Sequence, residues 1–162
     1  MDQTPAAYHA TLRLPVGELA LRFGQRGVAE VRILAAGRET VAVEHDERAA
    51  RLLGQVVAHV LDGAPRPEVP VEPAGTAFQC RVWRELQTIA RGQTRTYGEI
   101  ARSLGTSARA VGGACRANPI LLLVPCHRVV PVAGTGGFSG ASRGHWPAVK
   151  AWLLEREGAA VR

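Results

Sequence analysis

Apolar and polar residues alternate along the first part of the chain, over residues 8–14, 17–24 and 28–35. Turn residues separate the three runs, at residues 15–17 and 24–27. A period of two is typical of strands with one buried face, and short turns join strands that run antiparallel. The pattern therefore predicts a three-stranded antiparallel meander.

The period changes to that of a helix over residues 45–61, where apolar residues recur at a spacing of three or four. Asp46 and Glu47 lie near the start of this segment, and Gly63 follows its end. Acidic residues favour the first turn of a helix and glycine favours its end, so we expect a helix here.

Residues 62–75 are rich in proline and glycine and are predicted to form a linker, which can add an edge strand at residues 69–71. The elements before and within the linker predict a small N-terminal α+β domain over residues 1–75. Its histidines are scattered and form no reactive group of side chains, so we expect no chemistry in this part.

Three helical segments follow the linker, each opened by a hydroxyl side chain that can cap its first turn. Thr76 opens a helix to about residue 90, Thr96 opens 97–104, and Ser107 opens a helix to about residue 117. A short turn at Gly105 joins the last two, which is the outline of a helix-turn-helix. The fold class is thus α+β, with residues 76–162 as a mostly helical domain containing a winged-helix-like helix-turn-helix.

The third of these helices places Arg109, Gly112, Gly113 and Arg116 on one face. Two glycines inside a helix cost about 1 kcal/mol each relative to alanine, so a reason for them is expected. A bare face edged by arginine suits close approach to the minor groove of DNA. The alternative is tight helix–helix packing through the glycines.

Composition narrows the function classes. The net charge is +6 and Lys150 is the only lysine, so arginine carries the excess. Arginine binds phosphate and stacks on bases, although a solvated basic surface is the alternative.

Three cysteines without a Cys-x-x-Cys pair argue against a disulfide framework and against a metal site. No membrane-spanning run or secretion signal is recognisable, so a cytoplasmic location is expected.

The candidate nucleophile follows an apolar run at residues 120–124, which predicts a buried strand or extended segment. Pro125 ends this segment, so Cys126 lies at an element end with His127 beside it. A neighbouring imidazole can generate the thiolate that nucleophilic chemistry needs. The alternative is a buried structural cysteine.

A carboxylate can complete this pair. Pro147 is expected in the first turn of the last helix, where Val149, Leu153 and Glu157 share one face. A carboxylate in line with apolar residues should be partly buried and paired, and His127 is the candidate partner. The alternative for Glu157 is an exposed helix end. Between the thiol and this helix, the glycine-rich loop 134–140 can wrap a ligand.

Residues 118–129, with Asn118-Pro119-Ile120 and Val124-Pro125-Cys126-His127-Arg128-Val129, resemble the active-site signature of the O6-alkylguanine-DNA alkyltransferases, or methylated-DNA–protein-cysteine methyltransferases. Further similar segments occur in the same order: residues 78–83, 96–101, 109–112, 137–140 and 152–158. The resemblance implies an enzyme that binds double-stranded DNA in the minor groove, flips out an alkylated guanine (or O4-alkylthymine), and moves the alkyl group irreversibly to its own thiol, without a cofactor or metal. It further implies a monomer that can cluster on DNA.

The resemblance also implies residue roles. Cys126 would accept the alkyl group, His127 would act as base through a water, Glu157 would orient His127, and Asn118 would brace the turn. Tyr97 would donate a proton to the leaving guanine and Arg109 would fill the vacated stack, with Thr96, Gly112, Gly113 and Arg116 also on DNA. Ser139, Phe138 and the Val129 backbone would contact the base.

Loop 140–148 is longer than expected of the family, which suggests altered tolerance for bulky alkyl groups or a DNA contact by Arg143.

Three other functions compete with alkyl transfer. A damage sensor of the alkyltransferase-like type would carry tryptophan in place of Cys126. A transcriptional regulator would use Cys126 as a redox sensor, and a cysteine hydrolase would turn over.

Overall fold

The computed structural model describes residues 7–34 and 41–160. Strands β1 (Ala10–Leu14), β2 (Gly17–Phe23) and β3 (Val28–Leu34) form an antiparallel sheet in the order β1-β2-β3. The predicted meander is therefore confirmed, apart from residue 35, which lies outside the described residues. On β2, Leu19 and Leu21 share the face that packs into the main core, while Ala20 between them is buried on the other face with Tyr8 and Leu34.

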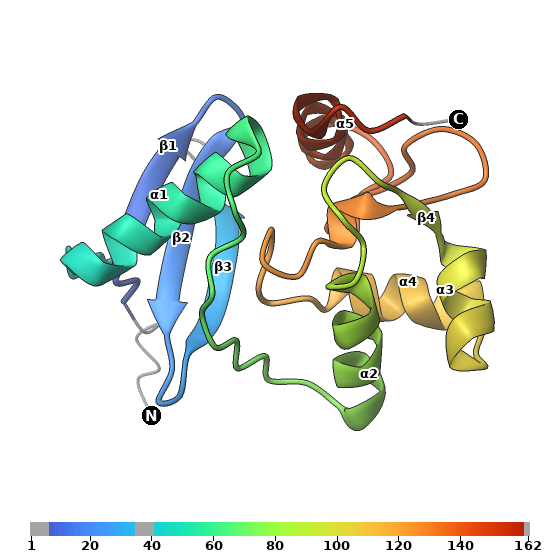
Figure 1. Cartoon of the computed structure of the whole chain (residues 1–162), viewed down its shortest axis with the longest axis horizontal. Coiled ribbons are helices and arrows are strands. Elements are labelled where there is room, and N and C mark those ends of the chain that lie inside the picture. Colours follow the sequence, from blue (N-terminus) through green and yellow to red (C-terminus); the bar gives the residue numbers. More distant parts are fainter. Residues whose placement is uncertain (1–6, 35–40, 161–162) are drawn as a thin grey trace.

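Helix α1 (Glu47–Asp62) covers one face of this sheet (Figure 1). The Asp46 carboxylate accepts a hydrogen bond from the Ala49 amide at 2.8 Å, and Gly63 ends the helix in the left-handed conformation at φ 74°. The helix turns Leu53, Val56 and Val60 into the core. The predicted helix and its end at Gly63 are confirmed, although the helix begins at Glu47 and not at residue 45.

The linker after α1 contains no regular helix or strand. The predicted edge strand is reduced to one isolated bridge between Val28 and Val71. The Val28 amide donates to the Pro70 carbonyl and the Glu72 amide donates to the Val28 carbonyl, each at 2.8 Å. Pro70 lacks an amide hydrogen, so it cannot donate the bond that would extend the ladder toward Arg26.

Seven short elements complete the chain. They are α2 (Ala77–Leu86), β4 (Arg95–Thr96), α3 (Tyr97–Leu104), α4 (Ala108–Arg116), the 3-10 helix η1 (Cys126–Arg128), β5 (Val129–Val130) and α5 (His145–Glu157). Thr76, Thr96 and Ser107 cap α2, α3 and α4 as predicted. The predicted end of the first helix near residue 90 is wrong. The Thr88 hydroxyl bonds the Glu85 carbonyl at 2.7 Å and the Ile89 amide bonds Leu86, which tightens the end of α2 into a 3-10 turn.

Helices α3 and α4 form the predicted helix-turn-helix, joined through Gly105 in the left-handed conformation. β4 leads into α3 and pairs in parallel with β5, which follows η1 (Figure 1). A short sheet beside a helix-turn-helix gives the winged-helix-like arrangement, so the α+β fold class is confirmed.

Residues 120–124 are buried, but the predicted strand or extended segment is wrong. The chain folds back at Leu122, whose φ is +70°, and the Val124 amide donates to the Ile120 carbonyl at 2.9 Å. The Asn118 side chain fixes this turn: its Oδ1 accepts from the Ile120 amide at 3.0 Å and its Nδ2 donates to the Val124 carbonyl at 2.8 Å. Local side-chain bonds thus replace a strand ladder.

The same turn joins the two halves of the chain. The Val31 amide of β3 donates to the Pro119 carbonyl, and the Leu121 amide donates to the Val31 carbonyl, each at 2.9 Å. One continuous group of buried apolar side chains includes residues of the sheet, α1, α2 and α5. A division into domains at residue 75 remains a prediction.

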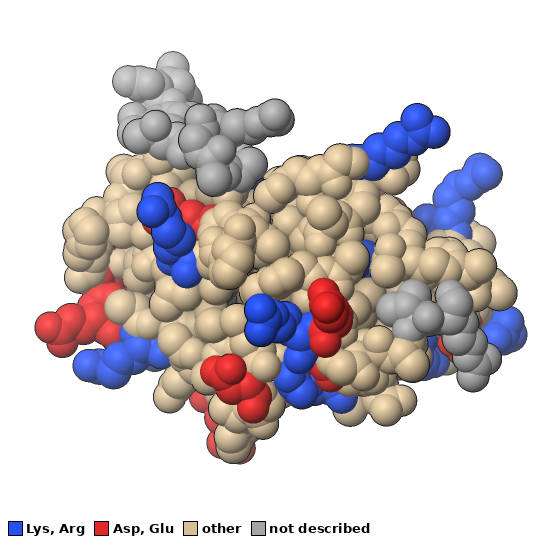
Figure 2. All heavy atoms as spheres, turned by 90° about the horizontal axis from the view of Figure 1, so that it is seen from above, with Lys and Arg blue, Asp and Glu red and all other residues tan. Residues whose placement is uncertain are grey.

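The face seen in Figure 2 carries basic and acidic side chains together, and acidic ones lie mainly toward its lower left and middle. The net charge of +6 is therefore not gathered into one patch on this face. Among the helices of the described ranges, none is long and apolar enough to span a membrane.

Candidate active site

Cys126 begins η1, directly after Pro125 and the turn that Asn118 fixes. The cysteine is 5% exposed, and Asn118 Nδ2 donates to its Sγ at 3.3 Å. Burial raises the pKa of Cys126, while the bond from Asn118 and the charge of Lys150 act in the opposite direction. The same amide therefore shapes the loop and supports the thiolate.

His127 and Glu157 form the predicted pair. His127 Nε2 lies 2.9 Å from Glu157 Oε1, and neither side chain is more than 1% exposed. His127 Nδ1 is buried and has no hydrogen-bond partner within the described part of the chain. The alternative of an exposed Glu157 at the helix end is wrong, because the last turn of α5 packs inward.

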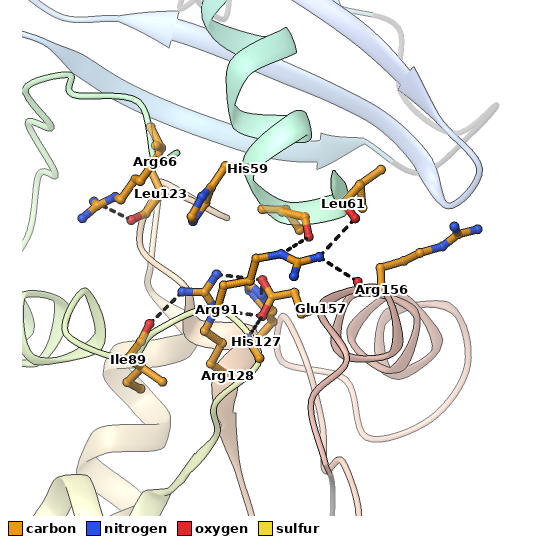
Figure 3. A network of polar contacts seen from close by, with 12 residues as sticks. His59, Leu61, Arg66, Ile89, Arg91, Leu123, His127, Arg128, Arg156 and Glu157 are labelled. Atoms are coloured by element: carbon orange, nitrogen blue, oxygen red, sulfur yellow. Dashed lines mark hydrogen bonds and ion pairs between the residues drawn. The ribbon is translucent and has the colours of Figure 1, made fainter. Parts of the chain in front are cut away.

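Arg128 is a member of this group that sequence reasoning missed (Figure 3). Its Nε and Nη2 donate to the two carboxylate oxygens of Glu157 at 2.9 and 2.8 Å, and its Nη1 donates to the Ile89 carbonyl at 2.7 Å. Both side chains are buried, so this is a desolvated bidentate ion pair. The sequence offered no periodic signal for it, because Arg128 lies in a short 3-10 turn.

The charges in this group define the state of the imidazole. Burial alone would raise the pKa of Glu157, but hydrogen bonds from His127 and Arg128 outweigh it and hold that pKa at about 2. Burial, and the charge of Arg128, lower the pKa of His127. Glu157 is therefore an anion and His127 a neutral imidazole. The Nε2–H of His127 donates to the Glu157 carboxylate, which leaves Nδ1 of His127 as a free proton acceptor.

Lys150, the only lysine, is also buried and was missed. Its Nζ donates to the carbonyls of Val129 at 2.6 Å and Gly137 at 3.2 Å, and lies 5.6 Å from the centre of the Tyr97 ring. Burial lowers its pKa to about 8. A signal existed: Lys150 lies three residues before Leu153, on the apolar side of the last helix.

A cavity of about 530 Å³ opens beside the thiol. Its lining residues are Tyr97, Arg109, Gly112, Gly113, Cys115, Arg116, Cys126, Gly137, Phe138, Ser139, Gly140, Ala141 and Ser142. Eight of the residues singled out from the sequence are thus brought together around one space. Burial raises the pKa of Tyr97 to about 12, so its phenol remains a proton donor at neutral pH.

The two glycines of α4 do not serve helix packing. A Cβ atom at Gly113 would meet no atom within 4 Å, and one at Gly112 would meet only Tyr97 Cε1 at 4.0 Å. The packing alternative is therefore wrong, and the glycines leave the cavity side of α4 open.

Two of the residues predicted to contact DNA or the base, Thr96 and Val129, do not line the cavity. The Thr96 hydroxyl caps α3, accepting from the Glu99 amide at 3.1 Å and donating to the Glu99 carboxylate at 2.9 Å. Val129 is buried in β5, and its carbonyl accepts from Lys150. In the longer loop, Ser142 reaches the cavity whereas Arg143 is exposed outside it. The described residues contain no cluster of three or more His, Cys, Asp or Glu that could hold a metal ion.

Comparison with known proteins shows the family. The family model described as "6-O-methylguanine DNA methyltransferase, DNA binding domain" matches residues 77–159. A methylated-DNA–protein-cysteine methyltransferase of Methanosarcina acetivorans is 35% identical over 93% of this chain and 98% of its own length. One of Mycobacterium tuberculosis is 36% identical over 93% of this chain and 92% of its own.

Solved structures agree. The O6-methylguanine methyltransferase of Mycobacterium tuberculosis has a TM-score of 0.76 and 34% identity, covering 94% of this chain and 92% of its own. The OGT of the same organism in complex with DNA has a TM-score of 0.75 and 34% identity, covering 94% of this chain and 93% of its own. Sequence, fold and site geometry together place this chain in the 6-O-methylguanine DNA methyltransferase family.

Proposed function

We propose that this protein repairs DNA by moving an alkyl group from O6 of guanine, or O4 of thymine, directly and irreversibly to Cys126. One observation carries the proposal: a buried thiol opens into a cavity, and a His–Glu–Arg group lies behind it. Membership of the family supports the same reaction. The bond that forms is carbon to sulfur, and a thioether is stable in water, so each molecule acts once.

The proton of the thiol goes to His127. Its Nδ1 is the free acceptor, and a water between Sγ and Nδ1 carries the proton. Glu157 stabilises the imidazolium that forms, because its carboxylate already accepts the Nε2–H. Arg128 keeps that carboxylate ionised and oriented. The Asn118 amide stabilises the thiolate at the moment of attack.

Double-stranded DNA reaches the site through α4. Its glycine side offers backbone without side chains, and Arg109 and Arg116 edge it, which suits the minor groove. A base within the duplex cannot reach a buried thiol, so the damaged nucleotide must be flipped into the cavity. Arg109 fills the vacated place in the stack.

Within the cavity, the flipped base lies between the thiol and loop 134–140. Tyr97 donates a proton to the guanine as it leaves, which its high pKa permits. Phe138 and Ser139 contact the base from the loop. The Val129 backbone also holds the edge of the base, and Thr96 contacts the DNA. The protein acts as a cytoplasmic monomer, needs no cofactor, and can cluster on DNA.

The deciding experiment is intact mass measurement after mixing the protein with a duplex that carries one O6-methylguanine. We expect a gain of one methyl group, mapped to the peptide that holds Cys126. Cys126→Ala should bind the duplex and gain nothing, whereas Cys80→Ala, changed at a cysteine outside the cavity, should react as the wild type does. Tight binding without any gain in mass would instead indicate a damage sensor. Continued turnover of a simple ester would indicate a hydrolase.

A further inference from the structure

The cavity holds a second thiol that the proposed reaction does not use. Cys115 lies on α4 and lines the same space as Cys126 of η1. It is half-buried and takes part in no disulfide. Two nucleophilic sulfur atoms therefore border the one space into which an alkylated base would be delivered.

We propose that Cys115 is a second acceptor, which closes a thioether bridge to Cys126 when the transferred group carries a second electrophilic carbon. The substrate class is O6-guanine adducts whose alkyl chain ends in a leaving group, such as a haloalkyl chain. The inference rests on the proposed function, because Cys126 must take the chain first. The bridge would bind both ends of a bifunctional lesion to the protein and prevent transfer to a second macromolecule.

The two steps balance. In the first, the Cys126 thiolate forms a bond to the proximal carbon, the carbon–O6 bond breaks, and guanine leaves with a proton. In the second, Cys115 sulfur bonds the distal carbon and the carbon–halogen bond breaks. Halide leaves, and the thiol proton passes to solvent. The product is a protein in which two thioethers share one alkyl chain.

The charges around the two thiols favour reaction of Cys126 before Cys115. Burial raises the pKa of Cys115, and the negative charge of Cys126 raises it further, whereas the Lys150 ammonium lowers it. Alkylation turns Cys126 into a neutral thioether, which removes that repulsion and leaves the effect of Lys150 in place. Alkylation of Cys126 therefore makes ionisation of Cys115 easier than before, while burial of Cys115 continues to oppose it. The chain is then already tethered in the cavity, which gives the second attack the advantage of an intramolecular reaction.

Other nucleophiles are less well placed. The Lys150 amine donates to two carbonyls and would have to leave both before attacking. Cys80 lies outside this cavity, in a separate hollow with Trp83 and Pro73 between α2 and the linker. This difference makes Cys80 a matched control within the same chain.

The test uses a duplex with one O6-[(E)-4-chlorobut-2-enyl]guanine, whose trans double bond keeps the chlorinated carbon away from the base. The wild type and Cys80→Ser should gain the four-carbon chain without its chlorine, and peptide mapping should join the peptides of Cys115 and Cys126. Cys115→Ser and Cys115→Ala should still alkylate Cys126, which shows that they are folded. In both Cys115 variants, the transferred four-carbon chain should keep its chlorine or exchange it for hydroxyl, and no joined peptide should be found.

The outcomes separate the two proposals. Absence of any adduct on wild-type Cys126, from this duplex and from one with O6-methylguanine, would overturn the proposed function itself. An adduct on Cys126 that keeps its chlorine in the wild type would overturn only the second acceptor. A bridge that ends on Lys150, or one that persists in Cys115→Ser, would refute the assignment to Cys115.

Discussion

Arg128→Met tests whether the arginine holds the buried carboxylate of the His127–Glu157 pair. Arg128 is 4% exposed and directs two hydrogen bonds to Glu157 and one to the Ile89 carbonyl. Methionine fills a similar volume but donates no hydrogen bond. The variant therefore leaves Glu157 as a buried anion with only His127 and the more distant Gly92 amide, at 3.4 Å, as donors.

The expected loss in unfolding free energy is large. Removing one partner of a buried ion pair costs about 3–5 kcal/mol, against a total stability of about 5–15 kcal/mol for a typical protein. For a chain of this length, each kcal/mol moves the melting temperature by about 2–4 °C, so Arg128→Met should melt about 6–20 °C lower. Urea denaturation at pH 7 measures the difference in unfolding free energy directly.

The dependence on pH identifies the cause. The pKa of Glu157 is about 2 in the folded protein, below its ordinary value of 4.5, so its stabilisation is fully present above pH 4.5 and is lost as the pH falls toward 2. Without Arg128 the folded-state pKa rises, and the carboxyl group takes up a proton sooner. The free-energy difference between wild type and variant should therefore shrink as the pH falls below neutrality.

A matched control is the exposed pair of Glu47 and Arg51 on α1, where the nitrogen–oxygen distance is 3.8 Å and the side chains are 91% and 72% exposed. Arg51→Met should cost less than about 0.5 kcal/mol. The double variant Arg128→Met/Glu157→Leu should regain much of the lost stability, because no unpaired charge stays buried. Equal effects of Arg128→Met and Arg51→Met, or a double variant whose cost is the sum of the single ones, would refute the reasoning.

Three further changes test the site. Asn118→Ala leaves the buried Ile120 amide without its acceptor, so it should cost about 1–3 kcal/mol in urea denaturation and slow iodoacetamide labelling of Cys126, which loses its donor; unchanged labelling would count against a thiolate held by the amide. Lys150→Met removes a charge that lowers the pKa of Cys126, so iodoacetamide labelling of Cys126 should speed up at a higher pH in the variant than in the wild type. The two rates should differ most below pH 8, because the wild-type lysine itself loses its charge near a pKa of about 8. A curve that does not move would show that the charge is screened. In Gly113→Ala the added Cβ atom meets no atom within 4 Å, so the variant should be more stable by up to about 1 kcal/mol. It should bind duplex DNA more weakly in fluorescence anisotropy, because the methyl group stands between α4 and the groove. Full affinity would show that the DNA groove does not lie against Gly113.

The local signals in the sequence were read successfully where one residue acts on its own neighbours. Thr76, Thr96 and Ser107 cap helices whose starts were predicted to the residue, because a cap depends only on the next three amides. Helix α3 was also predicted at both ends, since Gly105 stops it locally. The His127–Glu157 pair was inferred because a carboxylate on an apolar helix face needs a partner.

The sequence by itself therefore determined the meander and the order of the helices, the caps, the thiol and its histidine, and the helix face that carries Glu157. Only the tertiary structure decided that Ile120 to Val124 form a turn, because buried apolar strands and buried apolar turns have the same composition and Asn118 chooses between them. Likewise, only the tertiary structure decided which groups the buried Arg128 and Lys150 bond. Their acceptors, at Ile89, Gly137 and Glu157, lie far along the chain, and no short-range pattern records which distant carbonyl or carboxylate will satisfy a buried cation.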